Sequence, residues 1–270
     1  METKTNRSRL SVSSTFALLA LFSGSIVSCG KTTDNLTLQS PDLTKQGSDD
    51  TENFLDDSYL THFGLPAARI NGKIWMRHNL GVNTNLDPDA LPMTTARHGN
   101  YYQWGKQVVN ATGAAKQQSN YNTVVPHDKS WNAGTEQAPL KATADPCPSG
   151  YRIPTATEVK NLISSVKTLA EGRWASNSEN YEANTVLISK SNPAVKLTIP
   201  TQGMFNFNNK LEPSSIINRG KTNYFWTSTV FGGRVRGFQS LQSGSATVYT
   251  VNTSGYDSKL VSFNVRCIAI

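Results

Sequence analysis

This sequence has little charge, few cysteines and histidines, and no known catalytic motif. Charged residues make up 17% of its 270 residues, and the lysines and arginines behind the formal net charge of +7 are scattered. Nucleic-acid binding needs clustered basic residues, so we do not expect it. The four histidines lack metal-ligand spacing, and no nucleophile elbow, phosphate loop or H-E-x-x-H helix occurs. We therefore expect no metal, no cofactor and no catalytic residue.

Long apolar runs are also missing. Residues 16–27 read FALLALFSGSIV, too short for a stable membrane-spanning helix. Basic residues precede this run and Cys29 follows it, so residues 1–28 have the pattern of a signal peptide. The end of the run resembles the lipobox of bacterial lipoproteins, in which the cysteine is acylated. This resemblance implies lipidation of Cys29, and the alternative is an ordinary secretory signal with an incidental cysteine.

Lipidation would hold the mature protein at a membrane without a spanning helix, because acyl chains contribute roughly 0.8 kcal/mol per buried CH₂. We expect an exported protein that is lipid-anchored to the cell envelope, at the outer membrane, facing either the periplasm or the exterior. Residues 29–57 are polar and lack a sustained apolar period, which predicts a flexible tether. Residues 58–270 are then the folded domain.

The three cysteines fit this organisation. An odd number is unusual in an exported protein. If Cys29 carries lipid, Cys147 and Cys267 remain as an even pair in an oxidising compartment. A bridge between them would close a loop of about 120 residues and stabilise the fold by up to roughly 4–5 kcal/mol. The alternative is two buried free thiols.

Most of the domain has the pattern of short strands separated by turns. The stretch 68–76 contains Asn71-Gly72 between two β-prone runs, which is the strongest short hairpin signal. A second turn at Asn192-Pro193 separates two further runs. Residues 106–143 form a long polar connection in which we expect irregular but ordered structure. The expected strands are residues 185–189, 195–199, 203–207, 224–229, 237–241, 246–251 and 262–270.

One amphipathic helix is expected at residues 155–171. Thr155 and Glu158 form a T-x-x-E capping box at its start, and Gly172 is a plausible stop. Apolar residues recur behind the cap at helical spacing: Val159, Leu162, Ile163, Val166, Leu169 and Ala170. One main helix among many short strands predicts an α+β domain with mostly antiparallel sheet.

Several segments resemble the Fibrobacter succinogenes major paralogous domain, which occurs in exported and lipoprotein chains of the Bacteroidetes type. The resemblance covers roughly residues 69–270, with Val159 standing where the family usually has tryptophan. It implies a C-type-lectin-like fold, shared distantly with formylglycine-generating enzymes, and a disulfide between Cys147 and Cys267. The similar segments are residues 74–80, 99–105, 145–155, 200–203, 224–229 and 263–267.

The resemblance also raises two kinds of site. A lectin-type calcium site needs carboxylate and amide ligands, but this chain has hydroxyl residues at Glu212-Pro213-Ser214 and Trp226-Thr227-Ser228, so we do not expect one. A formylglycine-generating site needs a reactive cysteine pair, whereas only Cys267 lies in the corresponding region. Trp75, Trp104 and Trp226 are expected in the core.

The remaining candidates are aromatic residues that could stack on sugars or anchor a protein partner. They are Trp131, Trp174, Tyr101 and Tyr102. The function expected is a non-catalytic binding or adhesion module for a glycan or protein ligand, with its binding surface in loops 106–143 and 204–223. One alternative is a structural or accessory subunit of a fimbria-like appendage or envelope complex. A third, weaker hypothesis is a formylglycine-generating-type enzyme.

Overall fold

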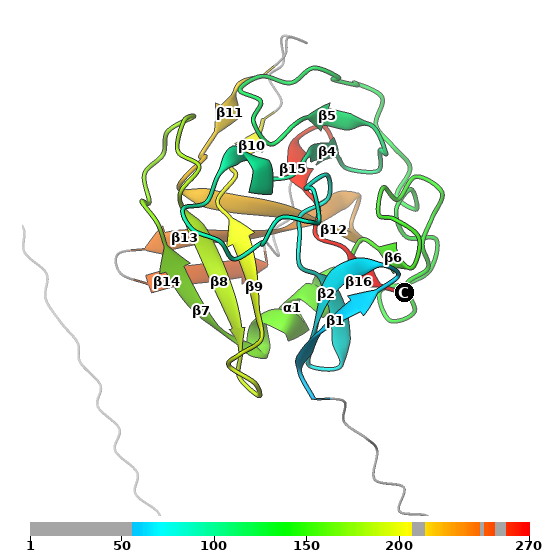
Figure 1. Ribbon diagram of the computed structural model, residues 1–270. Coiled ribbons are helices and arrows are strands. Elements are labelled where there is room, and N and C mark those ends of the chain that lie inside the picture. Colours follow the sequence, from blue (N-terminus) through cyan, green and yellow to red (C-terminus); the bar gives the residue numbers. More distant parts are fainter. Residues whose placement is uncertain (1–55, 207–213, 244–245, 252–257) are drawn as a thin grey trace, which may run out of the picture. The chain divides into compact units, whose positions relative to one another are not determined.

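The computed structural model describes residues 56–206, 214–243, 246–251 and 258–270 (Figure 1). The signal peptide, Cys29 and nearly all of the expected tether lie outside these residues, as do Glu212 and Pro213. The predictions made for them therefore remain predictions.

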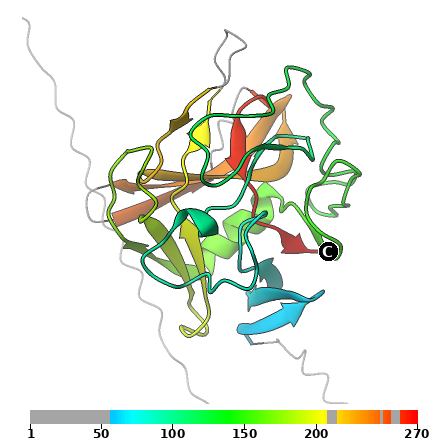
Figure 2. The ribbon, with the colours of Figure 1, turned by 45° about the horizontal axis from the view of Figure 1, so that its top comes forward.

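Three sheets, antiparallel except for one strand pair, build the domain. The first has the order β1-β2-β3-β16-β6, with β1 Ser58–His62, β2 Leu65–Ile70, β3 Lys73–Met76, β16 Ile268–Ala269 and β6 Tyr151–Arg152. The third has the order β7-β8-β9, with β7 Val166–Glu171, β8 Asn184–Ser189 and β9 Lys196–Pro200. Figure 2 shows the C-terminal end of the chain beside the first sheet, where β16 pairs with β3.

The second sheet is the largest and contains one parallel pair, β12 with β15. Its path is β11 Ile216–Ile217, β10 Met204–Phe205, β15 Ser262–Asn264, β12 Thr222–Phe231, β13 Arg234–Ser243 and β14 Ala246–Val251. Two more strands continue from β15: β4 Tyr101–Gln103 and then β5 Val109–Ala111. The strand expected at 203–207 is only β10, and residue 207 is not described.

The α+β prediction is wrong, because the regular secondary structure of the described residues is almost entirely strand. They contain one α-helix of nine residues, α1 Ala156–Ser164, and one 3-10 turn, η1 Thr95–Arg97. The expected helix 155–171 ends at Ser164, and its second half is β7, which pairs residue by residue with β8. Leu169 is 47% exposed on this strand, so the apolar residues that suggested one helical stripe belong to two different elements.

The start of α1 is as predicted. Thr155 Oγ1 accepts a hydrogen bond from Glu158 N at 3.2 Å, and Glu158 Oε2 accepts one from Thr155 N at 2.8 Å. Arg152 completes the cap, since its guanidinium donates to both Glu158 oxygens at 2.8 and 2.5 Å. Burial opposes ionisation of Glu158, but these donors hold the pKa of its carboxyl below the usual value.

The predicted hairpins are also confirmed. Ile70 pairs with Lys73 across Asn71 and Gly72, whose φ angles of 50° and 69° define the type I′ turn that an Asn-Gly pair favours. Strands β8 and β9 correspond to the runs expected on either side of Asn192-Pro193.

The core surrounds α1 and the disulfide. Helix α1 lies between the first and third sheets in Figure 1, and its Val159 and Leu162 pack into the apolar cluster that includes Trp75. A second cluster contains Trp104, Trp226, Cys147 and Cys267. Cys147 and Cys267 are bonded to each other, as parity and the resemblance both suggested. The three tryptophans expected in the core are all buried.

Candidate functional site

A groove separates loop 125–137 from the tip of the β12–β13 hairpin. It consists of two adjacent hollows of about 490 and 550 Å³, and Asp128 and Gly233 line both. We call it the hairpin groove and define it by residues 125–137, 228–233 and 258–260. Two of its walls come from segments about one hundred residues apart in the sequence.

An irregularity in β12 shapes one wall. The register between β12 and β13 shifts between Trp226 and Val230, as in a β-bulge. The backbone N–H of Ser228, within this bulge, does not pair with β13. It donates to Pro154 O, two residues before α1, at 2.8 Å. The bulge therefore joins the hairpin to the segment that leads into α1.

The hairpin tip presents an exposed aromatic ring. Phe231 precedes the turn at Gly232 and Gly233, which have φ angles of 60° and 74° that favour glycine. Its side chain is 71% exposed, and the Arg236 guanidinium lies 5.3 Å from the ring centroid. An aromatic face beside polar groups is a typical feature of ligand-binding surfaces.

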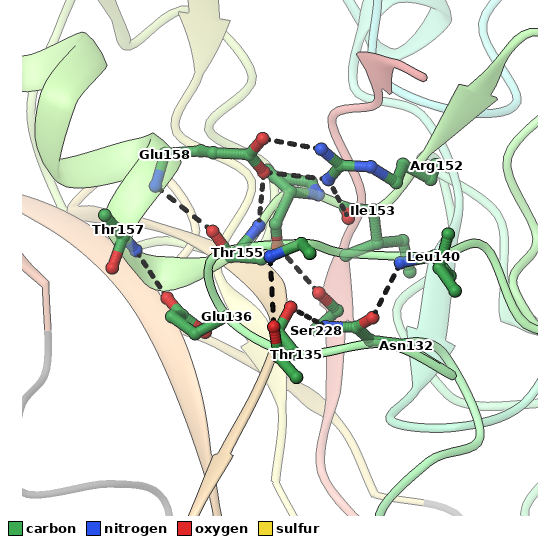
Figure 3. Close-up of polar contacts among 12 residues, drawn as sticks. Asn132, Thr135, Glu136, Leu140, Arg152, Ile153, Thr155, Thr157, Glu158 and Ser228 are labelled. Carbon is green, nitrogen blue, oxygen red and sulfur yellow. Dashed lines mark hydrogen bonds and ion pairs between the residues drawn. The ribbon is translucent and has the colours of Figure 1, made fainter.

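Asn132 organises the opposite wall. Its Oδ1 accepts hydrogen bonds from Gly134 N at 2.9 Å and Leu140 N at 3.0 Å, and its Nδ2 donates to Thr135 O at 3.1 Å (Figure 3). Trp131, the preceding residue, is buried and donates from Nε1 to Ala144 O. The loop thus closes on itself around one amide and is held to the core by one indole.

Glu136 connects this loop to both α1 and the hairpin. Its Oε1 accepts from Thr157 N at 2.8 Å, as Figure 3 shows, and its Oε2 accepts from Thr229 Oγ1 at 2.6 Å. Thr229 Oγ1 in turn accepts from Ala156 N at 2.8 Å. The carboxylate therefore lies at the positive end of the helix dipole and satisfies a first-turn N–H that the helix leaves without a partner.

Removing the Glu136 carboxylate should loosen the groove wall. We expect Glu136→Ala to lower the free energy of unfolding by about 1–2 kcal/mol, the usual value of a helix cap, and to speed amide exchange at Thr157. Glu136→Gln retains one acceptor oxygen and should have a smaller effect. Gln137→Ala, at the exposed neighbouring position, serves as the control in denaturation and hydrogen-exchange measurements. Unchanged exchange at Thr157 in Glu136→Ala would contradict this role.

The second hollow has a paired charge at its base. Lys259 is buried, donates to Pro126 O at 2.8 Å and forms an ion pair with Asp128. Its Nζ also lies 4.9 Å from the Trp104 ring centroid. Because Asp128 is balanced by Lys259, and the exposed Val125 lines the same hollow, this part of the groove is nearly neutral.

None of the aromatic candidates lines the groove. Trp131, Tyr101 and Tyr102 are buried, so the expectation that they are exposed for ligand contact is wrong. Tyr101 and Tyr102 belong to β4, which pairs with β15 inside the second sheet, and Tyr101 OH donates to Gln202 O. Trp174 is half-buried, donates to Glu171 O and does not line the groove. Its role in binding stays a prediction.

The described segments also bear on metal binding and on membrane spanning. Within them, no three His, Cys, Asp or Glu side chains are grouped so that they could hold a metal ion. Trp226 of the compared calcium motif is buried, and Thr227 Oγ1 donates to Arg236 O. None of the described helices has the length and hydropathy needed to cross a membrane.

The comparison with known families decides the identity of the domain. Residues 68–269 match the Fibrobacter succinogenes major domain. The chain belongs to this family. No curated protein and no solved structure matches the chain.

Segments that carry the family resemblance meet in the interior of this Fibrobacter succinogenes major domain. Asn79 and Asn264 each donate from Nδ2 to His98 O at 2.9 Å, and Arg266 donates from Nε to Asn79 Oδ1 at 2.9 Å. His98 is buried, and burial lowers the pKa of its imidazole to about 4, so the ring is neutral near pH 7. These contacts place the segments around Asn79 and Asn264 in the core, whereas Ser228 and Thr229, at the end of the similar segment 224–229, line the groove.

Sequence reasoning missed most of the groove. Phe231-Gly232-Gly233 does carry a hairpin signal, but that signal does not reveal that the aromatic ring remains exposed. In the sequence Glu136 is only one carboxylate within a loop, because its partners Thr157 and Thr229 are distant along the chain. The broader expectation of a binding surface within residues 106–143 overlaps with the groove wall at 125–137.

Asp145 fixes the loop that connects the groove wall to α1. Its two oxygens accept hydrogen bonds from Cys147 N and Ile153 N, both at 2.8 Å. Lys141 holds the same loop, donating to Pro148 O at 2.9 Å and Tyr151 O at 2.8 Å. Burial raises the pKa of the Asp145 carboxyl from 3.8 to about 6, although both N–H donors oppose the shift.

This raised pKa gives a signed pH dependence. The folded state binds the Asp145 proton more tightly than the unfolded state, so its contribution is most favourable below pH 4 and declines as pH rises through about 6. Between pH 4 and 7, we expect the unfolding free energy of wild type to fall relative to Asp145→Asn by about 2–3 kcal/mol. Urea unfolding of both proteins at each pH measures this difference. A constant or rising difference would contradict it.

Proposed function

We propose that this protein is a cell-envelope lipoprotein whose Fibrobacter succinogenes major domain binds a glycan in the hairpin groove, without catalysing a reaction. The observation that carries the proposal is the groove itself. It combines an exposed aromatic ring at Phe231 with hydrogen-bonding groups on the facing loop. Pyranose rings have apolar faces and hydroxyl edges, and a groove of this composition complements both.

Charge supports a neutral or weakly charged ligand. Asp128 is paired with Lys259, and the Glu136 oxygens accept from Thr157 and Thr229. A sugar hydroxyl can both donate and accept hydrogen bonds, so it suits a groove whose charged groups already have partners. We expect ligand binding to change little with salt, since interactions between unbalanced charges are the ones that screening weakens.

A lectin-like fold belongs to the same proposal. The Cys147–Cys267 bridge ties the segment before α1 to the end of the chain, as the resemblance implied. Because Cys267 is bonded, it supplies no reactive thiol while the bridge is intact, which argues against chemistry of the formylglycine-generating type. Fold alone does not determine a ligand, so the glycan is inferred from the groove.

A glycan array probed with the purified protein tests ligand binding. We expect signal on one class of neutral saccharides. An array on which no glycan gives a signal would contradict the proposal. The anchor is tested separately by fractionating cells that express wild type or Cys29→Ala. Wild type should sediment with the envelope, whereas membrane association that persists in Cys29→Ala would exclude the lipid anchor.

A second candidate function rests on the first sheet. Strand β1 lies at its edge, and β2 is the partner recorded for it in the described part of the chain. An open edge can accept a strand from a neighbouring subunit, as in many appendages. Crosslinking followed by pull-down distinguishes this role, because a stoichiometric protein partner would favour an accessory subunit.

A further inference from the structure

Basic residues gather at the end of the domain where the described chain begins. We call this surface the basic end. Three of its side chains are Lys73 in the β2–β3 hairpin, Lys160 on α1 and Lys190 after β8, and all three are exposed. Arg69 and Lys167 belong to the same surface, from β2 and β7. Five basic residues from four parts of the fold therefore share one end.

Asp57 and the C-terminal end of α1 hold these parts together. Asp57 accepts from Asn71 N at 2.7 Å and from Ser189 Oγ at 2.5 Å, which joins the β2–β3 turn to the end of β8. Lys190 donates from Nζ to Ser164 O at 2.6 Å, at the last residue of α1. The turns and the helix terminus are therefore neighbours in space.

Further pairings place the other basic residues on the same surface. Arg69 pairs with Ser58 across β1 and β2, and Lys167 pairs with Ile188, two residues before Lys190. Lys73 lies two residues after Asn71, whose N–H donates to Asp57, so the β2–β3 turn carries this lysine.

Acidic partners are scarce at the basic end. Its five members, Arg69, Lys73, Lys160, Lys167 and Lys190, form no ion pair within the described segments. Asp57 is buried and occupied by its hydrogen bonds, and Glu158 is paired with Arg152. Asp56, the residue before Asp57, is an exposed carboxylate near this surface in the sequence. The surface therefore carries a net positive charge.

We propose that the basic end docks on an anionic lipid surface, an inference that rests on the lipid anchor of the proposed function. About 27 residues separate Cys29 from Asp56. A flexible chain of that length has an average span of about 30 Å, which is of the order of one domain diameter. Acidic headgroups then stay within reach of the basic end, where each nearby lysine strengthens attraction to an anionic membrane.

This docking would orient the hairpin groove. Glu136 contacts the first turn of α1, whereas Lys190 contacts its last residue. The Glu136 and Lys190 contacts thus lie at opposite ends of a nine-residue helix, which is about 13 Å long at 1.5 Å per residue. A domain that rests on lipid through its basic end would hold the groove away from the lipid.

Vesicle cosedimentation of the mature chain, residues 29–270 carrying Cys29→Ser, tests the docking independently of acylation. We expect binding to vesicles of phosphatidylcholine mixed with phosphatidylglycerol, and much weaker binding to pure phosphatidylcholine. The triple variant K73Q/K160Q/K190Q should bind the anionic vesicles roughly 100-fold more weakly. The matched control K106Q/K116Q/K221Q, with three lysines neutralised outside both the basic end and the hairpin groove, should bind like the parent.

Two outcomes would overturn the docking. One is equal binding of anionic vesicles by the two triple variants. The other is that the parent does not bind the vesicles and binding appears only after the acidic residues are neutralised in D49N/D50N/E52Q. That result would mean that the acidic stretch, and not lipid, is the partner of the basic end. Because no acyl group takes part, this experiment can succeed or fail independently of the Cys29→Ala fractionation.

Discussion

Replacing Arg266 with methionine is expected to lower the free energy of unfolding by about 3–5 kcal/mol. The guanidinium is buried and donates to Asn79 Oδ1 at 2.9 Å, to Met76 O at 3.1 Å and to Thr198 O at 3.0 Å. It thereby links β3 to β9. Burial lowers the pKa of Arg266 to about 9. In the methionine variant the three acceptor oxygens would remain buried without a hydrogen-bond donor, which is the source of the expected destabilisation.

Urea denaturation should compare the free energy of unfolding of Arg266→Met with that of the control Arg173→Met. Arg173 is an exposed arginine whose pair with Glu182 spans 3.8 Å, so its loss should change stability by less than about 1 kcal/mol. Arg266→Lys keeps a positively charged donor at this position and serves as a second variant in case Arg266→Met does not fold. It should also be destabilised, because an ammonium donates fewer bonds in a different geometry. Equal stability of Arg266→Met and Arg173→Met would contradict the role assigned to Arg266.

Loss of the disulfide should have a similarly large effect. Cys147 and Cys267 are 120 residues apart, and constraining a loop of that length in the unfolded chain is worth about 4–5 kcal/mol. We expect the double variant Cys147→Ser/Cys267→Ser to lose that much stability, and a reducing agent to destabilise wild type comparably. The variant itself should not respond to the reducing agent. Wild-type stability that is the same with and without reductant would contradict the prediction.

Local signals in the sequence predicted local structure well. The Asn71-Gly72 turn and the Thr155–Glu158 capping box both appear as expected, because each depends on residues within one turn of chain. The Cys147–Cys267 bridge was suggested by the cysteine count, on the condition that Cys29 is lipidated, and by the family resemblance. Burial of Trp75, Trp104 and Trp226 followed from their size and apolar surface.

Predictions that depended on distant contacts failed. Residues 166–171 have helical spacing of apolar residues, but pairing with β8 makes them a strand, and a single sequence does not reveal that partner. Trp131 lies in a polar loop, but its ring packs in the core, with its centroid 5.1 Å from that of Trp104. The hairpin groove was missed for the same reason, since loop 125–137 meets residues 228–233 only after folding.

The central claim is that the hairpin groove binds the ligand, and matched phenylalanine variants test it most directly. Phe231 is 71% exposed beside the groove, and Phe63 is 67% exposed in the β1–β2 turn, outside it. With the strongest saccharide from the array, calorimetry should give a Kd about 10- to 100-fold higher for Phe231→Ser, because exposed aromatic anchors dominate such sites. Phe63→Ser should stay within about twofold of wild type. Equal affinities in the two variants would contradict the account.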